Sequence, residues 1–296
     1  MRHLVFLFTA VILFSCGGAD SDCMDFTFED DFYAADYSVE NSSEIIEFNE
    51  NWKFADFSKI HTGQAVLYKA ADNRKNKTVA VNAGHGTKGG SLLKTYSHPD
   101  KSPKITGGTN AKGSLESMAV SGGMTFCCGL SEAEVNLRVA LILRKLLLET
   151  GFDVLMIRNS DDVQLDNIAR TVISNNNADI NIAIHFDGDG NKKDKGVFYC
   201  GVPDELNALL ENVKKHSVKS ERLGGCIVSG LRSQGMKVYS GGRTENDLTQ
   251  TSYSTIPTVD IELGNQCTVP NTASLEKRAT GILNGVLVYF NSALCQ

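Results

Sequence analysis

From Lys77 onward, short apolar runs of strand length alternate with longer segments whose apolar residues recur at helical spacing. Strands are expected at 78–82, 152–157, 179–185 and 258–262, and helices at 135–150, 165–176, 204–219 and 274–290. The first helix is followed by Gly151, a typical residue at a helix C-terminus. This alternation predicts an α/β fold in one three-layer domain, with a mostly parallel or mixed sheet covered by helices on both faces. Ligands in such folds gather at strand ends.

Four ionisable residues lie where these runs end or begin. His85, His185 and Glu262 each end or follow a predicted strand, and Glu132 precedes the first predicted helix. Two imidazoles and a carboxylate are a common ligand set for catalytic zinc, and a further carboxylate can transfer protons. Each histidine alone is explained as a turn or core residue, and Glu132 as an acid favoured by the helix dipole. An unpaired Glu262 in a buried strand would be costly, and the combination predicts a metallohydrolase with its zinc site at the strand ends.

The N-terminus has the features of a secretory signal, with Arg2 followed by an apolar run from Leu4 to Phe14. This run is too short to span a bilayer. Residues 13–16 resemble a bacterial lipobox, so we expect a lipoprotein signal peptide at 1–15, lipidation of Cys16 and an extracytoplasmic location in a bacterial envelope. The alternative is plain secretion with cleavage nearby.

An acidic segment follows the signal. Eleven Asp and Glu residues lie between Asp20 and Glu50, and no Lys or Arg occurs between Arg2 and Lys53. We therefore expect a solvated acidic tether at 16–52, although its aromatic residues could pack on the domain, and a catalytic domain at 53–296. The 28 basic and 24 acidic residues from position 51 onward make this domain mildly basic, without the basic stripe that would indicate nucleic acid binding.

The eight cysteines do not have the spacing of a structural zinc site, because no two of them form a Cys-x-x-Cys motif. If Cys16 carries lipid, seven cysteines remain, and the sequence does not determine how they pair. A metal role for the adjacent Cys127 and Cys128 is disfavoured, because the set of oxygen and imidazole ligands is already complete.

The segment 87–129, here called the long loop, contains eight glycines and little periodicity between two candidate ligands. A connection of this length within a domain is often a functional lid or binding loop. A surface insertion without function is the equally weighted alternative.

Five short motifs, in order from about Lys77 to the C-terminus, resemble those of the zinc-dependent N-acetylmuramoyl-L-alanine amidases, which act as bacterial autolysins and in cell separation. The motifs are Gly84-His85-Gly86; Glu132 with Val135, Leu137, Val139 and Ala140; Gly151, Val154 and Arg158 with Arg170, Ala178 and Asp179; Ile182-Ala183-Ile184-His185; and Pro257, Ile261, Glu262 and Gly264. Each motif is weak alone, but five in the same order are specific.

The resemblance implies that His85, Glu132 and His185 bind Zn²⁺ and that Glu262 carries the proton from water to the leaving amine. The register of the family's helix motif selects Glu132 rather than Glu134. The implied reaction is hydrolysis of the amide bond between N-acetylmuramic acid and L-alanine in peptidoglycan, at a zinc ion with one open position. The expected partners are therefore peptidoglycan and, through the lipid anchor, a membrane, with no nucleic acid and a monomeric protein.

The sequence departs from the family pattern at Asn82-Ala83, where Asp-Pro is usual, at Asp187, where Asn is common, and at Asn265, where Phe is usual. None of these changes removes a proposed ligand. Asp187 is expected to orient a zinc-bound imidazole or to contact substrate, or else to be an ordinary loop acid. Arg243 is expected to line the groove for muramyl peptide, whereas Arg158 and Arg170 are expected to pair with nearby aspartates and stabilise the fold.

Two other functions remain open at this point. One is a zinc peptidase or another amidase acting on a different bond of the cell wall. The other is a catalytically silent lipoprotein that binds wall peptide, which the presence of all four chemical positions disfavours.

Overall fold

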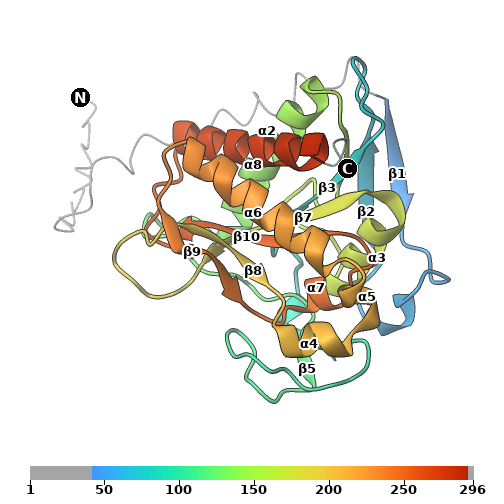
Figure 1. Cartoon of the computed structure of the whole chain (residues 1–296). Helices are drawn as coiled ribbons and strands as arrows, with labels where there is room; N and C mark the ends of the chain where they lie inside the picture. Colours follow the sequence, from blue (N-terminus) through green and yellow to red (C-terminus); the bar gives the residue numbers. More distant parts are fainter. Residues whose placement is uncertain (1–41, 293–296) are drawn as a thin grey trace, which may run out of the picture.

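Four parallel strands form the centre of an eight-stranded mixed sheet in the computed structural model, which describes residues 42–292 (Figure 1). The strand order is β1-β2-β6-β3-β7-β10-β8-β9. The strands are β1 (Ser43–Glu47), β2 (Gln64–Tyr68), β3 (Thr78–Ala83), β6 (Asp153–Met156), β7 (Ile180–Asp187), β8 (Val197–Gly201), β9 (Val238–Glu245) and β10 (Thr258–Asn265). A separate hairpin in the long loop pairs β4 (Lys94–Tyr96) with β5 (Glu116–Met118).

Helices cover both faces of this sheet. They are α2 (Glu132–Glu149), α3 (Asn167–Asn177), α4 (Asp204–Leu209), α5 (Glu211–Lys214), α6 (Ser217–Ser233), α7 (Thr249–Ser252) and α8 (Thr272–Ser292), with short 3-10 turns η2 (Ala55–Phe57) and η3 (Gly90–Leu92). Figure 1 shows α6 and α8 side by side on one face, where α2 also packs against α8. On the other face, α3 packs against β3 and α7. These are the three layers predicted from the alternation of elements.

The alternation of side chains along the strands explains these layers. In β3, Val79 and Val81 belong to the large apolar core under α2, α6 and α8, whereas Ala80 packs with Leu155 and Ile173 in the core under α3. Because β3 has parallel neighbours on both sides and helices on both faces, almost all of its side chains are buried. This explains why the strand is a continuous apolar run in the sequence.

The connections reverse direction at β3. The chain passes from β3 through α2 to β6 on one side, and then from β6 through α3 to β7 on the other side of β3. In open α/β sheets, such a reversal leaves a crevice beyond the carboxyl ends of the strands, where ligands bind. His85 follows β3, and His185 lies near the end of β7, so both histidines reach this crevice.

Most predicted elements are present within a few residues of the expected bounds. The predicted helix at 204–219 is wrong as one element: the extended backbone of Leu210 separates α4 from α5, and the next helix, α6, continues to Ser233. Strands β1, β2, β8 and β9 were not predicted. In β9, Gly241 and Gly242 have positive φ angles and break the alternation of apolar and polar residues that identifies a strand.

The domain begins earlier than the expected boundary at residue 53. Strand β1 pairs antiparallel with β2, and Phe48 and Trp52 pack against the core under α3. The last ten residues of the predicted tether therefore contact the domain through their aromatic side chains. The predicted signal peptide, Cys16 and the rest of the tether lie outside the described residues.

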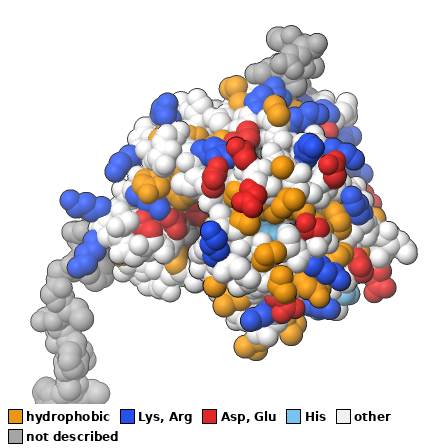
Figure 2. All heavy atoms as spheres, turned by 60° about the horizontal axis from the view of Figure 1, so that its bottom comes forward, with side chains coloured by type: hydrophobic (Ala, Val, Ile, Leu, Met, Phe, Trp, Pro, Cys, Tyr) orange, Lys and Arg blue, Asp and Glu red, His pale blue; other side chains and the backbone are white. Residues whose placement is uncertain are grey.

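On the face in Figure 2, Lys and Arg side chains are interspersed with acidic and apolar ones and form no continuous stripe. Among the helices of residues 42–292, none combines the length and apolarity needed to cross a bilayer.

Candidate metal centre

Three side chains that are far apart in the sequence converge at the crevice beside β3 and β7. Oε1 of Glu132 lies 2.9 Å from Nε2 of His85 and 3.0 Å from Nδ1 of His185. The two ring nitrogens are 3.1 Å apart. Within the described residues, these three groups form a cluster of the size that holds a metal ion. The structure thus brings together the residues predicted as ligands.

The turn after β3 places His85. Its backbone has a φ of 62°, in the left-handed region that is uncommon for residues other than glycine. The preceding Gly84 lies against the ring of His185, where an added Cβ would be only 2.1 Å from the nearest ring carbon. The turn therefore needs a glycine at 84 for the two histidines to approach each other.

Two fully buried arginines hydrogen-bond to the backbone of this turn. Arg158 donates to the carbonyl oxygens of Ala83 and Gly84, and Arg170 donates to those of Ala83 and His85. Burial lowers the pKa of Arg170 to about 9. The structural role predicted for both arginines is correct, but they donate mainly to backbone carbonyls, and Arg170 also to Asn82 and Thr87, instead of to the expected aspartates.

The long loop orients the ring of His85. Nδ1 of His85 lies 2.8 Å from the carbonyl oxygen of Ser121, which can only accept a hydrogen bond. Nδ1 therefore carries the hydrogen, and the lone pair of Nε2 faces the centre of the cluster. Nε2 of His185 lies 3.6 Å from Oδ2 of Asp260. When Nε2 carries the hydrogen, the lone pair of Nδ1 faces the same centre.

Glu132 is fixed by donors from three segments. The backbone amide of Met124 donates to its Oε2, and the amide of Phe186 and the side chain of Asn136 donate to its Oε1. Burial alone would raise the pKa of Glu132, but the charge of His85 and hydrogen bonds to both imidazoles hold it well below its usual value. Ser131 caps the helix by accepting from the amide of Glu134.

The donor set fits Zn²⁺. When both rings are neutral and in the tautomers above, and so no longer donate to Glu132, two ring nitrogens and one carboxylate oxygen all direct lone pairs at one point, where a cation relieves their mutual repulsion. Tetrahedral zinc with bonds of about 2.0–2.1 Å requires ligand atoms roughly 3.3 Å apart, close to the separations of 2.9 to 3.1 Å found here. Two nitrogens and one oxygen are also a ligand set of catalytic zinc sites.

Glu262 lies in β10 directly beside His185 and lines the same cavity. Its Oε2 is buried and has no hydrogen-bond partner. Burial, and then the charge of Asp260, raise the pKa of Glu262 well above its usual value. Burial would lower the pKa of His185, but the charges of Asp260, Glu132 and Glu262 raise it to about 9. The neighbouring carboxylates contribute to both shifts, and such an excess of negative charge favours a bound cation.

The site opens into a cavity of about 660 Å³ whose lining comes partly from the long loop. Gly123 of this loop packs so tightly on the ligands that an added Cβ would lie 2.8 Å from both Glu132 and the ring of His85. The loop is anchored further away by Asp247, which accepts hydrogen bonds from Lys104 and pairs with the buried His98. The long loop therefore packs against the site and is anchored to the domain.

Asp187 also lines this cavity, but its carboxylate contacts Lys195 and neither imidazole. The expectation that Asp187 orients a ligating histidine is therefore not met, and the carboxylate beside His185 is Asp260. The other two departures from the family pattern have structural partners. Asn82 donates to Gln250, and Asn265 donates to Asp189 and to the carbonyl oxygen of Lys193.

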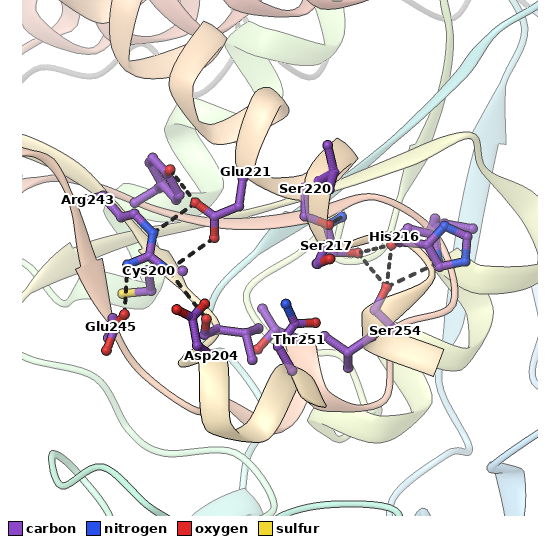
Figure 3. A pocket seen from close by; sticks show the side chains of 18 residues that line it. Cys200, Asp204, His216, Ser217, Ser220, Glu221, Arg243, Glu245, Thr251 and Ser254 are labelled. Carbon is purple, nitrogen blue, oxygen red and sulfur yellow. Dashed lines mark hydrogen bonds and ion pairs between the residues drawn. The ribbon is translucent and has the colours of Figure 1, made fainter. Parts of the chain in front are cut away.

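Arg243 does not line this cavity. It aligns with Tyr199 in the pairing of β8 and β9, and both side chains face Glu221 of α6 (Figure 3). They line a separate pocket of about 510 Å³. Asp260 and Glu262 project from the opposite face of the sheet, because successive side chains of a strand alternate between faces. The structure therefore places Arg243, which was expected to line the groove for muramyl peptide, outside the cavity of the metal centre.

Three functional contacts were missed in the sequence: Asp260, the carbonyl of Ser121 and the amide of Met124. Asp260 was detectable, because it lies two residues before Glu262 and so must share its face of β10. The two backbone groups have no signal in the sequence, since any residue carries a carbonyl and nearly any an amide.

Cys127 and Cys128 belong to no metal-ligand cluster of the described residues.

A family model described as N-acetylmuramoyl-L-alanine amidase matches residues 79–286. No curated protein matches the chain.

Solved structures share the fold at low sequence identity. An N-acetylmuramyl-L-alanine amidase from Mycobacterium smegmatis is 18% identical with a TM-score of 0.57, and the match covers 75% of this chain and 100% of that one. The CwlD amidase from Clostridioides difficile, solved in complex with the GerS lipoprotein, is 21% identical with a TM-score of 0.53, over 73% and 100% of the two chains. The apo amidase from Mycobacterium abscessus is 20% identical with a TM-score of 0.54, over 73% and 99%.

Proposed function

The chain belongs to the N-acetylmuramoyl-L-alanine amidase family, and we propose that it hydrolyses its peptidoglycan substrate with a zinc ion held by His85, Glu132 and His185. The family membership makes it a peptidoglycan amidase, acting on the bond between N-acetylmuramic acid and L-alanine. One observation carries the zinc proposal: three ligand atoms converge within 3.1 Å of one another beside the unpartnered carboxylate of Glu262.

A zinc ion with three protein ligands supplies a Lewis acid that polarises the amide carbonyl and lowers the pKa of water. The protein's part is to hold the three ligand atoms in place. Ser121 fixes the ring of His85, Asp260 lies at the outer nitrogen of His185, and Met124 holds the second carboxylate oxygen of Glu132. This support limits the reorganisation that the site needs during the reaction.

Glu262 is the proposed general base and general acid. Its Oε2 has no hydrogen-bond partner and its carboxyl group lines the cavity, so it is available to a water molecule or to the substrate nitrogen. It would take a proton from the attacking water and deliver it to the leaving amine of L-alanine. Removing such a group typically slows a reaction by about 10²–10⁴-fold.

The cavity suits a polar substrate. Its lining includes hydroxyl and amide side chains of the long loop, of the segment before α7 and of α7 itself, among them Ser91, Thr109, Asn110, Asn246 and Gln250. Such groups can donate to and accept from the sugar and peptide portions of a muramyl peptide. We propose that the long loop forms one wall of the substrate site.

The zinc content and the digestion of purified sacculi by wild type, Glu262→Gln and Glu132→Gln test these roles. Glu262→Gln is expected to keep zinc and to lose at least about 100-fold in the rate of amide cleavage. Glu132→Gln should lose zinc. The matched control is Glu134→Gln, because Glu134 lies in the same helical turn and pairs with Arg138 outside the cavity.

The products separate this function from its alternatives. Cleavage at the expected bond releases intact stem peptides with free L-alanine amino termini, which mass spectrometry of the digest detects. Cuts within the stem peptide would instead indicate a peptidase. A purified protein without zinc that releases nothing from sacculi would indicate a wall-binding lipoprotein without activity.

We further propose that Cys16 carries a lipid anchor, that the protein is an extracytoplasmic monomer and that the acidic residues before β1 act as a spacer. The sequence of the first fifty residues supports the anchor and the spacer. The substrate supports the extracytoplasmic location, because peptidoglycan lies outside the cytoplasm. Mass spectrometry of the mature N-terminus is expected to find a diacylated Cys16 that is absent from a Cys16→Ala variant. An unmodified N-terminus at another residue would contradict the anchor.

A further inference from the structure

Two thiols face each other beside the metal centre. Cys127 lies in the turn that precedes α2, and Cys267 follows the end of β10, 140 positions later in the chain. Their sulfur atoms are 2.9 Å apart. A disulfide bond is about 2.05 Å long, so a movement of less than about 1 Å would bring the sulfurs to bonding distance.

The backbone holds both cysteines in this arrangement. The amide of Cys127 donates to the carbonyl oxygen of Gln266, so the two segments are joined next to the sulfurs. The turn around Cys127 is closed by hydrogen bonds from Phe126 to Leu130 and from Gly129 to Phe126. The amide of Cys267 donates to the side chain of Asn265. The proximity of the thiols therefore does not depend on a chance side-chain orientation.

The surroundings favour a covalent bridge over a metal site. Within residues 42–292, no third His, Cys, Asp or Glu joins Cys127 and Cys267 in a cluster of metal-binding size. Cys127 is exposed and Cys267 partly exposed, so both thiols are accessible to a redox reagent. The other described cysteines differ: Cys200 is buried, and neither Cys128 nor Cys226 has a sulfur partner among the described residues.

We propose that Cys127 and Cys267 form an intrachain disulfide that locks the long loop to the strand of Glu262. Each thiol loses one proton and one electron as the sulfur–sulfur bond forms. The electrons and protons pass to a disulfide oxidant, such as oxidised glutathione or a thiol–disulfide oxidoreductase, which is reduced to two thiols. Such oxidants are typical of compartments outside the cytoplasm.

The position of this bridge gives it a defined effect. The same turn carries the amide of Met124 that holds Glu132, and the strand before Cys267 carries Glu262. Gln266 and Cys267 also contact the carbonyl oxygen of Asn191, in the segment that follows the strand of His185. The bridge therefore joins the segments next to three residues of the site, and its reduction frees the end of the long loop to open.

Peptide mapping of the full-length protein tests the bond. The protein is equilibrated with oxidised glutathione, its free thiols are alkylated in acid-quenched samples, and the tryptic digest is analysed without reductant. We expect the peptide with Cys127 and Cys128 linked to the peptide with Cys267, two hydrogens lighter than their sum. The link should persist in Cys128→Ser and Cys226→Ser and be lost in Cys127→Ser and Cys267→Ser.

Three results would overturn the bond: glutathione attached to both cysteines, free thiols at both positions, or a link through Cys128. Hydrogen exchange tests the effect on the loop. Amides at 121–129 should exchange at least about tenfold faster in the reduced protein, because the opening of this segment is no longer limited by the bridge. Equal exchange rates would overturn the lock. Both measurements are independent of zinc and of amide cleavage.

Discussion

The substitution Gly84→Ala should remove zinc binding while leaving the domain folded. An added Cβ would lie 2.1, 2.4 and 2.6 Å from Cε1, Nε2 and Nδ1 of His185. Unbonded carbon atoms normally stay about 3.5 Å or more apart, so the ring must retreat by at least about 1 Å. The backbone cannot move instead without breaking the bond from the amide of Gly84 to the carbonyl of Ile184.

The magnitude follows from the tolerance of metal sites. Zinc–ligand distances vary by only about 0.2 Å, so a shift of 1 Å removes His185 as a ligand. We expect zinc affinity to fall by at least about 100-fold, which corresponds to roughly 2.8 kcal/mol. The overpacking itself should lower the free energy of unfolding by about 1–3 kcal/mol, which an ordinary domain survives.

Competition of the variant with a fluorescent chelator measures zinc affinity, and urea unfolding measures stability. The matched control is Gly107→Ala. Gly107 lies in the long loop, and an added Cβ there meets no atom within 4 Å. The control should match wild type in both assays. Wild-type zinc affinity in Gly84→Ala would refute the assignment of His185 and the tight packing of the turn.

Three further predictions concern two residues that support the site and one that lies outside it. Arg170→Met should lower the free energy of unfolding by at least about 3 kcal/mol, because several buried oxygens lose their donor at about 1–3 kcal/mol each; an unchanged urea midpoint would contradict this. Burial would raise the pKa of Asp247, but hydrogen bonds from His98, Lys104 and Thr106 hold it well below its usual value. The stability that this carboxylate contributes is therefore present above pH about 4 and lost below it, so the difference in unfolding free energy between wild type and Asp247→Asn should shrink as the pH falls through that range. Arg243→Gln should digest sacculi at the wild-type rate, because Arg243 faces α6; a slower rate would return it to the substrate site.

The fold was predictable where local signals are strong. Strand β3 is buried on both faces, and α2 has a serine cap, regular apolar spacing and a terminal glycine, so each was recognisable from its own residues. Strands β1, β2 and the glycine-rich β9 lack such signals, and they depend on their pairing partners for stability. The break at Leu210 was also missed, since helical spacing on both sides of it is similar.

The site was predictable to the extent that its residues end or begin such elements. Parallel strands bring their carboxyl ends to one edge, which is why His85, His185 and Glu262 were expected together. Asp187 was expected to orient a ligating imidazole, but it contacts Lys195, and Asp260, which was not considered as a site residue, lies beside His185 because strand alternation places it on the same face of β10 as Glu262.

The sequence by itself determined the class of fold, the four chemical positions and the family, because apolar periodicity, caps and short motifs are properties of neighbouring residues. Only the tertiary structure decided which groups support those positions. The carbonyl of Ser121, the arginines below the turn of His85, the opposite orientation of Arg243 and the approach of Cys127 to Cys267 all depend on segments far apart in the chain. The order of the strands and the packing of the long loop bring these segments together, and no local pattern encodes those distances.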